Sequence, residues 1–176
     1  MGRLEYFDEI WDSNKSRSEI MDELSQITDY TSAILLDRFE FLLARNFSKV
    51  RVRSGACELI GALSNKNIDV AVISATPSDV LPGIVQDFFP KLEFALVQGG
   101  GYKSRVILQF LAKYRISPCD ALLFGDGFDD LLASQEAKIK FHGVSGWTLE
   151  ESGYRGPMIN DYFEIASRFG LAWECK

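Results

Sequence analysis

Residues 120–144 read DALLFGDGFDDLLASQEAKIKFHGV, and this stretch decides the fold. The run DALLFGD predicts a buried strand that ends on the carboxylate of Asp126, and KFHGV predicts a second strand. Between them, FDDLLASQEAK has the spacing of a short helix. Two strands joined through a helix are typical of a parallel sheet with helices on its faces. The stretch therefore indicates an α/β fold.

The same alternation extends along the chain from about residue 50. Further strands are expected in IDVAVISA and LEFALV. Helices are expected in GACELIGALSNKN, in PSDVLPGIVQDFF with an interruption or kink near Pro82, in GYKSRVILQFLAKYR and in GPMINDYFEIASRFG. This order predicts a doubly wound parallel sheet of the Rossmann type, in which a ligand binds at the carboxyl ends of the strands.

A helical hairpin is expected before this α/β region. The segment from residue 14 to residue 47 contains neither Gly nor Pro, and its apolar residues recur at helical spacing in two runs. In the second run, the helical spacing of Phe39, Phe41 and Phe47 favours core positions over a substrate pocket. The chain of 176 residues has the length of about one domain with an insertion.

Composition and charge exclude several classes of partner. Hydrophobic residues at 47% and charged residues at 25% are typical of a globular chain with a real core. The net charge of -6 would repel a nucleic-acid backbone, so we expect no nucleic-acid partner. We expect no membrane partner because no run approaches the ~18 uninterrupted apolar residues of a spanning helix. A small phosphorylated ligand stays compatible with this charge, because lysines, helix N-termini and metal ions can receive it. The oligomeric state is left open.

The cysteines and the single histidine narrow the chemistry further. Cys57, Cys119 and Cys175 are odd in number and lack zinc-site spacing, which favours a reducing cytoplasm. One histidine, His142, excludes most catalytic triads and favours a satisfied structural role on its strand. Any metal would then have oxygen ligands, as Mg²⁺ does.

Polar residues follow the strand IDVAVISA at its carboxyl end. Ser74 ends the strand, and Ala75 and Thr76 lie at the start of the next helix. A hydroxyl and helix N–H groups that face one point can bind phosphate or carboxylate. The alternative is an ordinary helix cap.

An acidic cluster follows the strand DALLFGD. Asp126, Asp129 and Asp130 lie within about one turn, and carboxylates so close repel each other unless a cation joins them. A divalent metal bound by Asp126 and Asp130 is the functional interpretation. The alternative is a helix start whose acids complement the helix dipole.

Two basic positions complete the set of candidates. Lys103 follows a glycine run at the beginning of a helix, where a cation opposes the dipole unless it has an anionic partner. A solvated surface lysine is the alternative. Arg51 and Arg53 could reach an anionic substrate, but their pattern favours a solvated pair.

Taken together, these strand ends resemble a known family. VISATPSDVL, Lys103 and FGDGFDDLLASQEAKIKFHGV resemble, in order, the second, third and fourth motifs of the haloacid dehalogenase superfamily. SGYRGPMINDYFEIASRF is similar to the family's final strand, loop and helix, and the resemblance covers about residues 50–170. It is most similar to the phosphoglycolate-phosphatase-like members.

The resemblance implies a Mg²⁺-dependent phosphatase that acts on a small phosphomonoester. Ser74 and Lys103 would contact the phosphoryl group, and Asp126, assisted by Asp130, would hold Mg²⁺. In that family a carboxylate nucleophile forms an aspartyl-phosphate, and a second carboxylate acts as acid and base. The resemblance also implies a core made of residues 1–13 and 48–176 with a short helical cap at residues 14–47.

The sequence departs from the family at its first motif, DxDx(T/V), which carries both carboxylates. IWDSNKSR resembles the segment that follows the motif. Counting back without a gap places Glu5 at the nucleophile position and Phe7 at the acid/base position; a one-residue deletion instead places Tyr6 and Asp8 there. Neither register restores the pair, so Glu5 and Asp8 are the candidates for the two roles.

Three functional interpretations therefore stay open. The first is a phosphatase with a substitute nucleophile. The second is a catalytically inactive module that binds phosphate and Mg²⁺ in a regulatory role, or a truncated chain that lacks its first strand. The third is a structural partner that acts through the hairpin and is indifferent to both ligands.

Overall fold

The structure is a computed structural model in which a defined part of the chain is described. The described ranges are 17–46, 51–74, 81–89, 94–97, 103–146, 149–150 and 152–168. The helices in these ranges are α2 (Arg17–Ile27), α3 (Ser32–Arg45), α4 (Ala56–Asn65), α5 (Leu81–Phe88), α6 (Lys103–Tyr114), α7 (Phe128–Ala137) and α9 (Tyr162–Arg168), with a 3₁₀ turn, η2 (Pro118–Asp120). The strands are β1 (Ala71–Ser74), β2 (Phe94–Val97), β3 (Leu122–Gly125), β4 (Lys140–Val144) and β5 (Met158–Ile159). This alternation confirms the α/β prediction.

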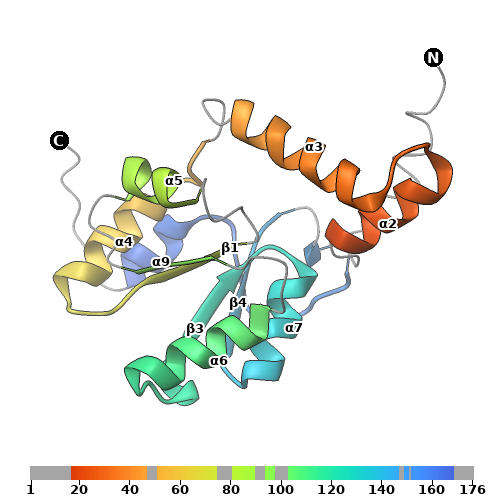
Figure 1. The fold of residues 1–176 in the computed structure, drawn as a ribbon. Coiled ribbons are helices and arrows are strands. Elements are labelled where there is room, and N and C mark those ends of the chain that lie inside the picture. Colours follow the sequence, from red (N-terminus) through yellow and green to blue (C-terminus); the bar gives the residue numbers. More distant parts are fainter. Residues whose placement is uncertain are drawn as a thin grey trace.

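Every described strand pairing is parallel, as expected for a sheet built from strand–helix–strand units. β1 pairs with β2 in one ladder, and β3, β4 and β5 form a second ladder in that order. Helix α6 packs against β1 and against α7, and α7 packs against β3 and β4 (Figure 1). Because β3 ends at Gly125 and α7 begins at Phe128, the end of β3 lies next to the start of α7.

Two apolar clusters hold the core together. One joins α4, β4, β5 and α9 through the buried residues Leu59, Val144, Ile159 and Ile165. The other joins α6 and α7 through Ile107, Leu111, Ala133 and Ala137, with Ile73 of β1 and Leu123 of β3 packed against it. The α6–α7 pair thus covers strands of both ladders.

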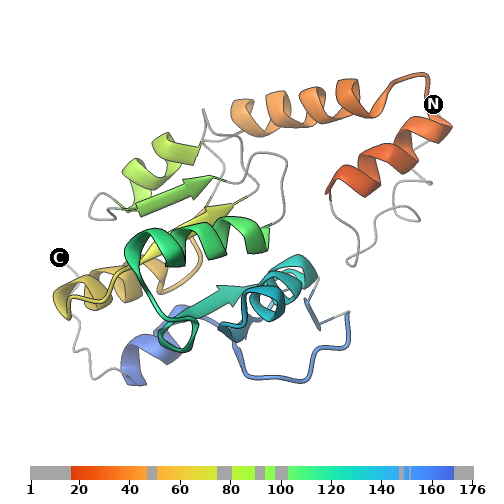
Figure 2. The same ribbon diagram turned by 60° about the horizontal axis from the view of Figure 1, so that its bottom comes forward.

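The hairpin α2–α3 is confirmed as two antiparallel helices packed on each other, and it lies to one side of the strands in both views (Figures 1 and 2). It is poorly buried, with a set of apolar side chains more than a third exposed: Ile27, Tyr30, Ile34, Phe41 and Leu42. The core interpretation is therefore wrong for Phe41, which is 55% exposed. Phe47 lies outside the described residues.

Two elements differ from the sequence-based expectation. The described helix α5 begins at Leu81 and runs through Pro82, whose missing N–H needs no partner in a first helical turn. The closing helix begins only at Tyr162, because Met158 and Ile159 form β5 against β4. A two-residue strand has no periodicity of its own, although the resemblance to the family's final strand, loop and helix had implied one in this segment. No helix within the described ranges is long and apolar enough to cross a bilayer.

A close backbone approach fixes the entrance to α4. Gly55 has φ +77°, and a Cβ at this position would lie 2.5 Å from the backbone nitrogen of Phe163 on α9. Gly153 has φ +78° but no atom within 4 Å of such a Cβ.

We expect Gly55→Ala to lower the free energy of unfolding by about 3 kcal/mol, since the left-handed conformation and the clash with backbone both oppose a side chain. Gly153→Ala has the same unfavourable left-handed conformation but no clash, so it should lower the free energy of unfolding by about 1 kcal/mol. Urea denaturation of both variants measures the difference. Equal losses would show that the contact with α9 is not tight.

Candidate functional site

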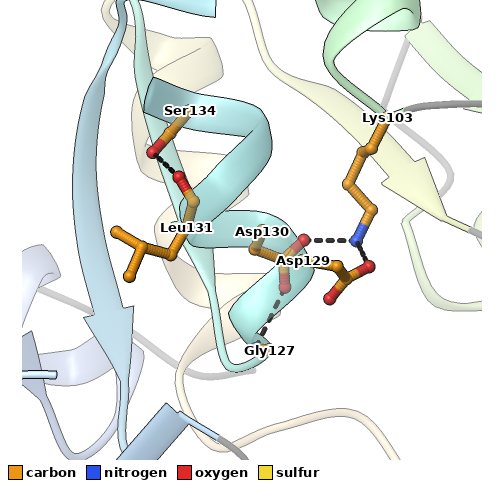
Figure 3. Close-up of polar contacts among 6 residues, drawn as sticks. All are labelled: Lys103, Gly127, Asp129, Asp130, Leu131 and Ser134. Carbon is orange, nitrogen blue, oxygen red and sulfur yellow. Dashed lines mark hydrogen bonds and ion pairs between the residues drawn. The ribbon is translucent and has the colours of Figure 1, made fainter. Parts of the chain in front are cut away.

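The candidate site is formed where β3 ends and where α6 and α7 begin. Lys103 is the first residue of α6, and Asp129 and Asp130 lie in the first turn of α7. The Lys103 Nζ donates to Asp129 Oδ2 at 2.8 Å and also to Asp130 Oδ1 (Figure 3). The interpretation of Lys103 as a solvated surface lysine is therefore wrong, because its side chain is only 11% exposed and has two anionic partners.

The protonation of Lys103 follows from these contacts. Burial acts to lower the pKa of Lys103, but the charges of Asp130 and Asp129 and the hydrogen bonds that they accept outweigh it. The pKa of Lys103 is therefore raised above its ordinary value. This ammonium group stays charged throughout the physiological range, as a group that neutralises phosphate must.

Asp130 is a supporting group with both oxygens occupied. Its Oδ1 accepts from Lys103, and its Oδ2 accepts from the backbone N–H of Gly127 at 3.1 Å. Burial raises the pKa of Asp130, more than the attraction of Lys103 lowers it, and the neighbouring Asp129 adds to the rise. Gly125 has to be glycine here, since a Cβ at this position would clash with the Cβ of Asp130.

Asp126 faces a different cation. Its side chain is 52% exposed, and its Oδ2 accepts from Nη2 of Arg53 at 2.5 Å. Arg53 also donates through Nη1 to the backbone carbonyl of Ser145, at 2.8 Å. The sequence favoured a solvated Arg51 and Arg53; the Arg53 side chain is 44% exposed, but it is also paired with Asp126.

A tyrosine that the sequence did not single out stands beside these charges. Tyr162, the first residue of α9, is partly buried against Leu59, Val144 and Ile159. Burial raises the pKa of its phenol; Arg53 opposes the rise, and the carboxylates of Asp126 and Asp130 add to it. The charges of Arg53 and of both carboxylates therefore act on one phenol. No motif points to Tyr162, which is part of an ordinary helical pattern.

The other predicted residues are only partly covered. Ser74 ends β1, as expected, and is half-buried. Ala75, Thr76, Glu5 and Asp8 lie outside the described residues. The expected satisfied role of His142 is not complete: its Nδ1 is buried and has no hydrogen-bond partner within the part of the chain that the structure describes.

The oxygen ligands available at the end of β3 are of the type that Mg²⁺ prefers. Asp126 offers a half-exposed carboxylate, a hard oxygen ligand. Among the described residues, no three acidic, histidine or cysteine side chains converge on one point. Mg²⁺ commonly takes one or two carboxylates, several waters and oxygens of a substrate phosphate, and does not require a cage made of protein alone. Asp126 could therefore be the ligand from the described residues, with Asp130 holding Lys103 in place.

The raised pKa of Lys103 makes a chemical prediction. We expect Lys103 to react with an amine-acylating reagent at pH 8.5 more slowly than Lys113 and Lys138, which are exposed, because protonation and burial both hide its lone pair. Peptide mass spectrometry after brief labelling measures the order. Labelling of Lys103 as fast as that of the two exposed lysines would show that its ion pairs do not persist in solution.

Comparisons with known proteins bear on the fold. No protein-family model and no curated protein matches the chain. Among solved structures, the chain is similar to a predicted phosphatase from Clostridium acetobutylicum, with TM-score 0.75 and 16% identity over 96% of this chain and 82% of the other. It is also similar to CbbY from Rhodobacter sphaeroides in complex with phosphate, with TM-score 0.70 and 13% identity over 93% of this chain and 80% of the other.

A third similar structure, from Lactobacillus delbrueckii, is assigned as a phosphoglycolate phosphatase. It gives TM-score 0.57 and 15% identity over 66% of this chain, which spans about half (52%) of that protein's length. At such low identities the likeness shows the fold. The fold is that of the haloacid dehalogenase-like hydrolases, as the motifs led us to expect.

Proposed function

We propose that this chain, on the fold of haloacid dehalogenase-like hydrolases, binds a small phosphomonoester together with Mg²⁺ and hydrolyses it. The observation that supports this most is Lys103, a nearly buried ammonium held by Asp129 and Asp130 beside the end of β3. In such a fold, ligands bind at the carboxyl ends of the strands. The chain would work in a reducing cytoplasm, in keeping with the exposed Cys57 and Cys119, which form no disulfide within the described residues.

Charge explains why the two ligands should bind together. At the end of β3, the carboxylates of Asp126, Asp129 and Asp130 face the cations of Arg53 and Lys103, which leaves one negative charge in excess. A phosphate dianion would be repelled by this excess. One Mg²⁺ ion removes this negative excess, whether or not Arg53 stays in place, and permits an anion to bind.

In this proposal Mg²⁺ would be held by Asp126 and would neutralise charge on the phosphoryl oxygens when bound. Lys103 donates from its fixed ammonium to another phosphoryl oxygen, and Asp130 keeps that ammonium charged and oriented. Ser74, at the end of β1, supplies a hydroxyl to the same group. The hairpin α2–α3 would act as the cap that limits access of water.

The nucleophile is the weakest part of the catalytic set. If Glu5 takes the role, its extra methylene displaces the attacking oxygen by about an ångström, and misplacement of that order costs ~10²-fold in rate. Loss of a proper general acid would cost a further ~10²-fold or more. These costs favour slow turnover, and they keep a second candidate function in place: a regulatory module that binds phosphate and Mg²⁺ without hydrolysis.

Release of phosphate from an aryl phosphate separates the two functions. The hydrolase predicts release that needs Mg²⁺, stops with EDTA, and is lost in Glu5→Gln or in Asp8→Asn. The structure does not describe Glu5 or Asp8, so the two variants also decide between the two registers of the first motif. Background release with retained binding of phosphate and Mg²⁺ would exclude the hydrolase and favour the regulatory module.

A further inference from the structure

Arg53 occupies the carboxylate that the proposed metal would need. Its guanidinium donates to Asp126 Oδ2 at 2.5 Å and to the Ser145 carbonyl at 2.8 Å. Asp126 follows β3 and Ser145 follows β4, so the guanidinium bridges the ends of two neighbouring parallel strands.

The position of Arg53 is fixed by the backbone that follows it. The carbonyl of Ser54 accepts from the N–H of Tyr162 at 3.1 Å, and Gly55 packs directly against the backbone of Tyr162 and Phe163. The guanidinium also lies 2.9 Å from the position that a Cβ on Gly146 would take, so Gly146 leaves room for it. The protein therefore provides a built position for a cation at Asp126.

This cation is held loosely enough to be exchanged. The side chains of Arg53 and Asp126 are 44% and 52% exposed, so water screens their attraction and the arginine can withdraw into solvent. By contrast, Lys103 is 11% exposed and has two carboxylate partners, which makes it a permanent member of the site. A divalent ion at Asp126 would be repelled by the guanidinium on the same carboxylate, and withdrawal of the exposed arginine into solvent removes that repulsion.

We infer that Arg53 is a displaceable counter-ion of Asp126 that competes with Mg²⁺ and so sets the affinity of the site for the metal. This inference rests on the proposed function, since it concerns the same Mg²⁺ site. Arg53 protects the acidic loop from self-repulsion while the metal is absent, and it makes metal binding weaker than Asp126 alone would allow.

Calorimetric titration of the full chain with MgCl₂ tests the inference. Arg53→Gln should bind Mg²⁺ about fivefold more tightly than the wild type, the factor that corresponds to the upper range for an exposed ion pair. Arg53→Lys keeps the charge but cannot donate to both acceptors as the guanidinium does. Its affinity for Mg²⁺ should therefore lie between those of the wild type and Arg53→Gln. Arg51→Gln removes one positive charge from the same segment and should leave the affinity unchanged.

The outcomes separate this inference from the proposed function. Wild-type binding that is lost in Asp126→Asn, together with equal or weaker binding by Arg53→Gln, would overturn the role of Arg53 and leave the metal site standing. Absence of Mg²⁺ binding in the wild type and in Arg53→Gln would overturn both. In the wild type, the ¹⁵N signal of the Arg53 guanidinium should shift on saturation with Mg²⁺; a signal that stays unchanged at saturation contradicts displacement, whatever the stability of the variants.

Discussion

Lys103→Met is expected to destabilise the chain by about 3 kcal/mol, since removal of one partner from a buried ion pair leaves an uncompensated charge. The substitution leaves Asp130, whose side chain is 13% exposed, beside Asp129 without the shared cation. Urea denaturation measures the loss. Lys113→Met, at the exposed end of the same helix, should stay within about 0.5 kcal/mol of the wild type.

A double variant shows whether charge is the cause. In Lys103→Met with Asp130→Asn, the unpaired carboxylate is gone, so part of the lost stability should return. Destabilisation by Lys103→Met that is no larger than that of Lys113→Met would show that the Lys103 ion pairs contribute nothing to the fold. If the losses in free energy of unfolding of the two single variants simply add in the double variant, the two side chains do not interact.

Asp126→Asn is expected to lower Mg²⁺-dependent turnover at least about 100-fold, or, without turnover, to abolish Mg²⁺ binding, because Asp126 is the half-exposed carboxylate that directly follows β3 and would hold the ion. Its stability should change by less than about 1 kcal/mol, since the pair with Arg53 is exposed to solvent. Loss of metal binding without loss of fold would thus identify a ligand.

Asp120→Asn is the matched control for this variant. Asp120 is an exposed acid that precedes β3, whereas Asp126 follows it, so the two substitutions remove one charge from opposite ends of one strand. Asp120→Asn should leave metal binding and turnover unchanged. If both variants lose Mg²⁺ equally, the ion responds to net charge and no site exists at Asp126.

Much of the fold could be predicted from local pattern. The strand at 122–125 and the helix at 128–137 follow from an apolar run and a helical repeat that need no distant partner to be recognised. β5 could not be predicted in this way, because two residues become a strand only when they pair with β4. The closing helix is correspondingly shorter than its sequence pattern predicts.

The site could be predicted where a charged residue has an unfavourable position at the end of a helix or strand. Lys103 opposes the dipole of its own helix, and this unfavourable placement correctly indicated an anionic partner. The identity of that partner was not predicted, since the acids of α7 were assigned to a metal and to the helix dipole.

The pairing of Arg53 with Asp126 had no local signal. The two residues are 73 positions apart, and their contact depends on how α4 and α9 dock beside β4. The arginine is exposed to solvent, as the sequence favoured, but its ion pair was not predicted. Contacts of this kind follow from tertiary packing and have no spacing rule.

Joint binding of phosphate and Mg²⁺ at the end of β3 is tested most directly by thermal unfolding of the wild-type chain. Inorganic phosphate, MgCl₂ and both together would be compared at matched ionic strength, each at about 100 times its dissociation constant. With Mg²⁺ alone we expect stabilisation of about 2.7 kcal/mol, and with both ligands about twice that, which is roughly 10–20 °C for a chain of this size. Phosphate without Mg²⁺ should change the melting temperature little. An equal rise with phosphate alone would contradict the joint site, as would no rise with both ligands.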